Sequence, residues 1–155
     1  MNETDRTETV PESGRWTAVI LVTFAFHFLW EMAQGNLYQQ MQSIPFWRAT
    51  AWCARATAGD LVITTIAFSA AARSGGLHWP LIRQRLSPAL IFLTVGVLIT
   101  LGYEIYALAI GRWTYDVRMP QVFGIGLSPL LQWIAIPPLE IAAFRVIWRR
   151  ARIDV

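Results

Sequence analysis

Four apolar runs dominate this sequence, and each is long enough to cross a lipid bilayer as a helix. They cover residues near 16–34, 51–72, 88–110 and 124–147. A helix needs about 20 predominantly apolar residues to cross the hydrocarbon core, and a helix satisfies its own backbone hydrogen bonds there. The sequence therefore predicts an all-α polytopic membrane protein with four transmembrane helices in a bundle of two hairpins.

Composition and the flanking segments agree with this interpretation. Hydrophobic residues make up 55% of the 155 residues, and the mean hydropathy is +0.41, which is too apolar for a soluble domain of this size. We expect a disordered cytoplasmic tail at 1–15, one transmembrane domain at 16–150 and a cytoplasmic C-terminus at 151–155. The acidic start lacks the basic region of a secretory signal, so the first run is expected to remain as a helix. Residues 77–86 resemble a short interfacial helix.

The distribution of arginine predicts the orientation. All thirteen basic residues are Arg. Nine of them lie in the tail, in the loop between the second and third runs, or at the C-terminus, and four lie on the opposite side. Because cytoplasmic loops carry the excess of positive charge, both termini are expected to be cytoplasmic. The Arg residues are scattered rather than clustered, which argues against nucleic acid as a partner.

Ionisable or amide side chains interrupt every apolar run. The first run carries His27, Glu31 and Gln34 on one helical face. The later runs carry Asp60, Glu104, and Gln132 with Glu140. A charged group at the bilayer centre costs roughly 2.5 to 3.5 kcal/mol on insertion scales, so it is kept where it has a partner or a function.

Counting along the predicted helices places most of these groups in one layer. At 1.5 Å per residue, Glu31, His27, Glu104, Gln132 and Asp60 lie roughly 5 to 15 Å below the outer ends of their runs. We therefore predict that three acids surround a pocket open toward the outer leaflet and act as its catalytic groups, while His27 tunes their protonation. These acids are Glu31, Asp60 and Glu104. The predicted supporting residues are His27, Gln34, Gln132, Trp30, Tyr103 and Glu140.

A structural interpretation stands beside the functional one. A single His or Gln on a buried helix face usually forms a hydrogen bond between helices. Glu140 lies eight residues beyond Gln132, toward the cytoplasmic end of its run and close to Arg145 and Arg149. For Glu140 we expect a partly hydrated carboxylate paired with Arg at the membrane interface.

Cofactor chemistry has little support in the sequence. The single cysteine, Cys53, excludes an internal disulfide and any Cys-rich metal site. Ligation of haem by two histidines is not expected, because His27 and His78 lie toward opposite membrane surfaces. His27 with Glu31, Asp60 and Glu104 is a chemically reasonable N/O ligand set, but the chain lacks the E-x-x-H pair of di-iron bundles. No metal is assigned, and no cofactor is identified.

Two short patterns resemble known groups of proteins. The segment Gly111-Arg112-Trp113-Thr114-Tyr115, followed by Gly124, Gly126, Pro138-Leu139-Glu140 and Phe144, resembles the membrane-embedded lycopene cyclase domain of carotenoid biosynthesis. That family usually has a second acid directly after the Glu, where this chain has Ile141. The whole chain is more similar to a group of four-helix integral membrane proteins of bacteria, with W-E-x-x-Q-x-x-L-Y, G-D and G-R-W-x-Y motifs. This resemblance implies a multi-pass protein of the bacterial cytoplasmic (inner) membrane.

Two classes of function follow from these observations. The first is a protein that binds a lipophilic, isoprenoid-like or carotenoid-like substrate and uses carboxyl groups for acid-base chemistry. The second is a non-catalytic membrane subunit or small transporter, whose buried acids serve helix packing or the passage of protons or cations. Membrane lipid is an expected partner in both cases, and the sequence predicts no oligomeric state.

Overall fold

The computed structural model describes residues 12–81 and 86–153, and it is mostly helical (82%), which confirms the all-α class. Four long helices are present: α1 (Glu12–Gln34), α3 (Phe46–Gly75), α4 (Leu86–Ala109) and α5 (Leu127–Ile153). Each overlaps one of the predicted runs. The short elements are η1 (Gly35–Leu37), α2 (Gln39–Gln42), η2 (Trp79–Leu81), β1 (Gln121–Val122) and β2 (Ile125–Gly126).

Some predictions fall at the edges of the described residues. Most of the predicted tail (1–11), part of the predicted interfacial helix (82–85) and residues 154–155 lie outside them. Residues 12–15, which were expected to belong to the tail, form the first turn of α1. The described part of the segment 77–86 contains the single-turn helix η2 and the first residue of α4.

Three helical segments are long and apolar enough to span a membrane. They are Glu12–Leu37, Leu86–Ala109 and Leu127–Arg149. Helix α3 is longer than any of them, with 30 residues, but it carries Arg48, Arg55, Asp60 and Arg73 and is rich in Ala, Gly and Thr. Its length corresponds to roughly 45 Å.

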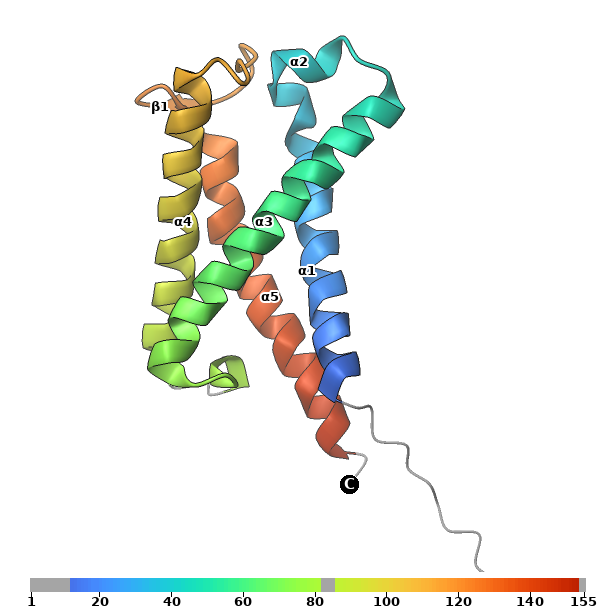
Figure 1. Ribbon diagram of the computed structural model, residues 1–155, viewed down its shortest axis with the longest axis vertical. Helices are drawn as coiled ribbons and strands as arrows, with labels where there is room; N and C mark the ends of the chain where they lie inside the picture. The colour runs from blue at the N-terminus through green and yellow to red at the C-terminus, as the bar shows by residue number, and fades with distance from the viewer. Residues whose placement is uncertain (1–11, 82–85, 154–155) are drawn as a thin grey trace, which may run out of the picture.

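The four long helices pack as a bundle in which α3 contacts α1 and α4, and α5 contacts the same two helices. Figure 1 shows α3 crossing the bundle obliquely, with the α1–α3 connection and the β1–β2 hairpin at one end. The α3–α4 connection, the start of α1 and the end of α5 lie toward the other end. The chain therefore forms two helical hairpins that open toward the same end.

Small and aromatic side chains set the helix contacts. A Cβ atom built on Gly96 of α4 would lie 2.0 Å from Cε3 of Trp133 on α5, and Trp133 is fully buried. The glycine thus lets the indole ring lie directly against the α4 backbone. Toward the α3–α4 connection, Ala67, Ala71, Trp79 and Phe92 form an apolar cluster.

Backbone hydrogen bonds join the two loops at the hairpin ends, and we call this contact the loop junction. Tyr38 and Tyr115 form an antiparallel bridge. The Gln39 N–H donates to the carbonyl oxygen of Thr114 at 3.0 Å, and the Asp116 N–H donates to that of Leu37 at 2.9 Å. The loop junction therefore ties the first hairpin to the second.

Candidate functional site

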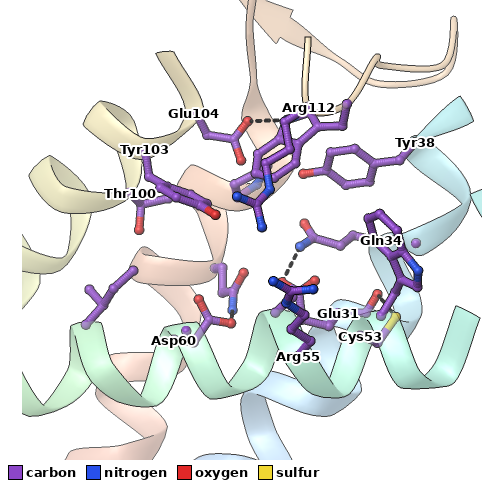
Figure 2. Close-up of a pocket in the computed structure, with 18 of the residues that line it drawn as sticks. Glu31, Gln34, Tyr38, Cys53, Arg55, Asp60, Thr100, Tyr103, Glu104 and Arg112 are labelled. Atoms are coloured by element: carbon purple, nitrogen blue, oxygen red, sulfur yellow. Dashed lines mark hydrogen bonds between the residues drawn. The ribbon is translucent and has the colours of Figure 1, made fainter. Parts of the chain in front are cut away.

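A cavity of about 510 Å³ lies between the long helices, next to the loop junction. Its wall includes three acids that come from three different helices, namely Glu31 of α1, Asp60 of α3 and Glu104 of α4. Figure 2 shows these acids around one space, together with Gln34, Tyr38 and Tyr103. The structure thus brings together the three carboxyl groups selected from the sequence.

Glu31 and Asp60 each accept a hydrogen bond from an amide side chain. Gln34 Nε2 donates to Glu31 Oε1 at 2.6 Å, and Trp30 Nε1 donates to Gln34 Oε1 at 3.2 Å. Gln132 Nε2 on α5 donates to Asp60 Oδ2 at 2.9 Å. The amides therefore fix the direction in which each carboxyl faces the cavity.

Glu104 is held by the loop that follows its own helix. The Tyr115 hydroxyl donates to Glu104 Oε2, and Trp113 Nε1 donates to the same oxygen at 3.3 Å. Glu104 is only 4% exposed, so these donors replace the water that the carboxyl has lost. Burial, and to a lesser extent the neighbouring Glu104, raise the pKa of the Tyr115 phenol, which therefore stays a proton donor at neutral pH.

A second polar group lies beside the cavity, and we call it the His27 cluster. It consists of His27, Asp60, Gln132 and Glu140. His27 is completely buried, and its Nδ1 lies 2.7 Å from Gln132 Nε2 and 3.5 Å from Asp60 Oδ2. On the other edge of the ring, Nε2 lies 3.3 Å from Glu140 Oε1. The imidazole thus bridges two carboxyl groups, and Asp60 belongs both to the cluster and to the cavity wall.

Glu140 differs from its expected environment. It is 8% exposed and contacts His27, while Arg145 donates to the carbonyl oxygen of Pro80 at 2.5 Å. The prediction of a partly hydrated carboxylate at the membrane interface is therefore wrong. The reason is geometric, because the helices cross obliquely and a residue count along each axis does not measure a common depth. Both Glu140 carboxyl oxygens are buried without a hydrogen bond to any described residue.

The supporting residues divide between the two sites. Gln34 and Tyr103 line the cavity, His27 and Glu140 lie in the His27 cluster, and Gln132 belongs to both. Trp30 acts through Gln34.

Sequence reasoning missed several residues of the cavity wall. These are Tyr38, Arg55, Arg112 and Trp113. From the sequence, both arginines belong to the charges that indicate the orientation of the bundle. Arg112 and Trp113 belong to the G-R-W-x-Y motif, but their position on the cavity wall depends on the loop junction, which no local pattern predicts. Arg55 and Gly59 are four residues apart on α3, so they share one face of the helix, and both line the cavity.

Among residues 12–81 and 86–153, no group of three or more His, Cys, Asp or Glu side chains is arranged to hold a metal ion.

Comparison of the chain with protein-family models, with curated proteins and with solved structures found no match.

Proposed function

We propose that this chain is an integral membrane protein that binds a lipophilic small molecule in the cavity and transfers protons to or from it through Glu31, Asp60 and Glu104. The observation that carries the proposal is the presence of three carboxyl groups, from three helices, on the wall of one 510 Å³ cavity. That volume lies within the range of roughly 300 to 1,000 Å³ typical of small-molecule sites.

The rest of the wall supports an apolar ligand. Its apolar lining includes Val62, Ile63, Ile99 and Pro129. A carboxylic acid can give a proton to a carbon–carbon double bond, and a carboxylate can accept a proton from a carbon next to such a bond. Neither step needs a redox cofactor. An isoprenoid-like substrate is therefore the best candidate, in keeping with the resemblance of the 111–115 segment to lycopene cyclase domains.

The proposal includes four membrane crossings in a bacterial inner membrane, with α3 as the fourth span and both termini cytoplasmic. Arg48 and Arg55 lie in the first third of α3 and Arg73 in its last turn, so only Asp60 interrupts the middle. Its length of roughly 45 Å exceeds the ~30 Å hydrocarbon core, which leaves room for an oblique crossing. The excess of Arg at one end supports the orientation.

Filling the cavity tests ligand binding. Gly59 lines the cavity, and a Cβ atom built on it meets nothing within 4 Å. We expect Gly59→Leu to reduce the lipophilic material that co-purifies with the protein, as measured by mass spectrometry of a solvent extract. Gly102→Leu is the matched control, because Gly102 also has open space around its Cβ position but does not line the cavity. Equal extracts from the two variants would contradict the proposal.

A second candidate function, proton passage, is favoured by one observation. The His27 imidazole contacts Asp60 on the cavity wall and Glu140 on its other side, so it links the cavity to a carboxyl deeper in the bundle. In liposomes loaded with a pH-sensitive dye, His27→Gln should then slow acidification driven by a potassium-diffusion potential. His78→Gln is the control, since His78 is exposed and lies outside the His27 cluster. Equal rates for wild type and His27→Gln would exclude this function.

A further inference from the structure

We propose that the ligand of the cavity is an apolar chain that carries a phosphate group, and that Arg55 and Arg112 bind this phosphate. The inference rests on the proposed binding function and names the chemical class of the ligand. Arg55 comes from α3, and Arg112 comes from the loop after α4. Both line the cavity, and Figure 2 shows their side chains extending into it from these two elements.

The two guanidinium groups have no counter-charge in the described part of the chain. Neither forms an ion pair or a hydrogen bond with another described residue, although three acids share the same wall. Those acids accept their hydrogen bonds elsewhere, as Glu104 does from Tyr115 and Trp113. Because a guanidinium remains charged at any physiological pH, an anion in the cavity would stabilise both groups.

One of the two arginines makes cation–π contacts with two aromatic rings. The Arg112 guanidinium lies 5.8 Å from the Tyr103 ring centroid and 6.0 Å from that of Trp113. A cation–π contact of this kind does not use the N–H groups of the guanidinium as hydrogen-bond donors. Arg112 is therefore held in place without using its hydrogen-bonding capacity.

An unpartnered hydroxyl inside the cavity is independent evidence for a polar ligand group. Thr100 Oγ1 is buried and forms no hydrogen bond within the described residues, and Thr100 as a whole is 8% exposed. Thr100 lines the same cavity as the two arginines. A buried hydroxyl without a partner is unfavourable, so a purely hydrocarbon ligand would leave this cost in place.

The number of donors favours phosphate over carboxylate. One guanidinium fork is enough for the two oxygens of a carboxylate, whereas a phosphate ester has three free oxygens that can accept from two forks and a hydroxyl. The apolar wall, which includes Val62, Ile63 and Ile99, accommodates the chain. The site thus combines an anionic subsite with a hydrocarbon subsite.

The test uses the full chain in phosphatidylcholine nanodiscs with 11-bromoundecyl phosphate and 11-bromoundecanol as probes. Bromine quenches tryptophan fluorescence at short range, and Trp52 and Trp113 line the cavity. We expect the phosphate to bind at least roughly tenfold more tightly than the alcohol. Arg55→Gln and Arg112→Gln should each weaken binding of the phosphate by roughly tenfold to a hundredfold, the range for hydrogen bonds to a charged group, while leaving the alcohol unchanged.

Two further variants keep the result interpretable. Arg48→Gln is the matched control, because Arg48 lies on the same helix but stacks on Trp47 at 5.1 Å and does not line the cavity. It should bind both probes as the wild type does. Arg55→Lys keeps the charge and loses the fork, so its affinity for the phosphate should fall between those of wild type and Arg55→Gln.

Four outcomes would overturn the inference. The first is that the wild type binds 11-bromoundecyl phosphate and 11-bromoundecanol equally tightly, and the second is that Arg48→Gln and Arg55→Gln lose the same affinity for the phosphate probe. The third is that the wild type binds 11-bromoundecanoate as tightly as the phosphate probe. The fourth is that inorganic phosphate displaces the phosphate probe at the same concentration as the probe. The last would assign the arginines to a free anion rather than a lipid. Failure of the proposed function has a different result. In that case, 11-bromoundecanol would quench the tryptophan fluorescence of Gly59→Leu as strongly as that of the wild type.

Discussion

Glu104 shows how a carboxyl group is kept inside an apolar helix. Its partners, Tyr115 and Trp113, come from the loop nine to eleven residues later, so a local segment satisfies the acid. The same loop contributes Arg112 and Trp113 to the cavity wall. The hydrogen bonds to Glu104 therefore connect α4 to the loop that forms part of the cavity wall.

Removing the hydroxyl of Tyr115 should destabilise the protein measurably. Tyr115→Phe leaves Glu104 with fewer donors while the volume of the core is almost unchanged, and the expected loss is about 1 to 3 kcal/mol. The thermal unfolding midpoint in detergent should fall accordingly. Tyr106→Phe is the control, because Tyr106 lies on α4, the helix of Glu104, and is 55% exposed. Equal midpoints for the two variants would show that the Tyr115–Glu104 bond is not a net stabiliser.

The His27 cluster should be more sensitive still. His27→Ala removes the group that contacts both Asp60 and Glu140, and a buried charge without its partner typically costs about 3 to 5 kcal/mol. His78→Ala is the comparison, since His78 is exposed, and a surface change of this kind costs roughly 0.5 kcal/mol or less. Denaturant unfolding in mixed micelles would measure both. Similar losses in the two variants would mean that the cluster is not a buried ionic network.

Sequence reasoning at the scale of single residues had a clear limit. A polar side chain in an apolar run is recognisable from the sequence, so Glu31, Asp60 and Glu104 can be selected as candidates. The structure places all three on the wall of one cavity. Arg55 and Arg112 could not be selected in this way, because arginine near the end of a span has an ordinary explanation in membrane topology. Only the tertiary structure shows that their guanidinium groups belong to the cavity.

At the scale of helices, close contact between α4 and α5 depends on Gly96. Gly96→Ala would place a methyl group 2.0 Å from Cε3 of the buried Trp133 ring, so the helices would have to move apart. Overpacking of this kind typically costs about 1 to 3 kcal/mol. Gly102→Ala on the same helix meets nothing within 4 Å and should be neutral or stabilising, by up to roughly 1 kcal/mol.

Thermal unfolding of the two glycine variants tests whether Gly96 sets the distance between α4 and α5. A large fall in the midpoint for Gly96→Ala with no fall for Gly102→Ala is the expected pattern. Parallel behaviour of the two variants would show that the indole ring can move aside and that Gly96 does not set the distance between the helices.

The extents of the helices were accessible from the sequence, but their crossings were not. Apolar runs of about 20 residues predict helices because a bilayer demands them, and each run overlaps one long helix. Glu140 illustrates the part that failed. Its depth was counted along a straight axis, whereas the oblique packing of α1 and α5 brings it to His27. Side-chain packing between distant segments sets such angles, and hydrophobic periodicity within one segment does not encode it.

At the scale of the whole molecule, the loop junction holds the two hairpins together through groups outside the membrane spans. Asp116 Oδ2 accepts from Gln42 Nε2 at 2.7 Å, and Asp116 Oδ1 accepts from Arg118 Nε at 2.5 Å. The hydrogen bond from Arg118, followed by that from Gln42, lowers the pKa of Asp116 to about 2. The charged form of this carboxyl is therefore the one that joins the loops.

This pKa gives the junction a defined pH dependence. In the unfolded chain an Asp titrates near pH ~3.9, so the stabilisation from Asp116 is fully present above that pH. It is lost as the pH falls from about 4 through about 2. Asp116→Asn should lower the thermal midpoint at pH 7, and the difference from wild type should shrink toward pH 2. A difference that stays constant from pH 7 to pH 2 would contradict the role of the carboxylate.

The positions of the two ends of the bundle bear on how many helices cross the membrane and in which orientation. The start of α1 and the end of α5 lie toward one end of the bundle, and the loop junction lies at the other (Figure 1). If only the three most apolar helices crossed the membrane, the two ends of the chain would lie on opposite sides. The proposed topology therefore counts α3 as a fourth crossing, and on the excess of Arg it assigns the end opposite the loop junction to the cytoplasm.

Cysteine labelling separates these alternatives, because Val117 is 96% exposed in the loop between α4 and α5 and Leu77 is 49% exposed between α3 and α4. In a Cys53→Ala background, a membrane-impermeant maleimide should label Val117→Cys in intact bacterial cells, but should label Leu77→Cys only after permeabilisation. The reverse pattern would invert the bundle. Labelling of both sites from outside would remove α4 as a membrane span, because these two positions lie on either side of that helix, and the proposed four-helix topology would fail with it.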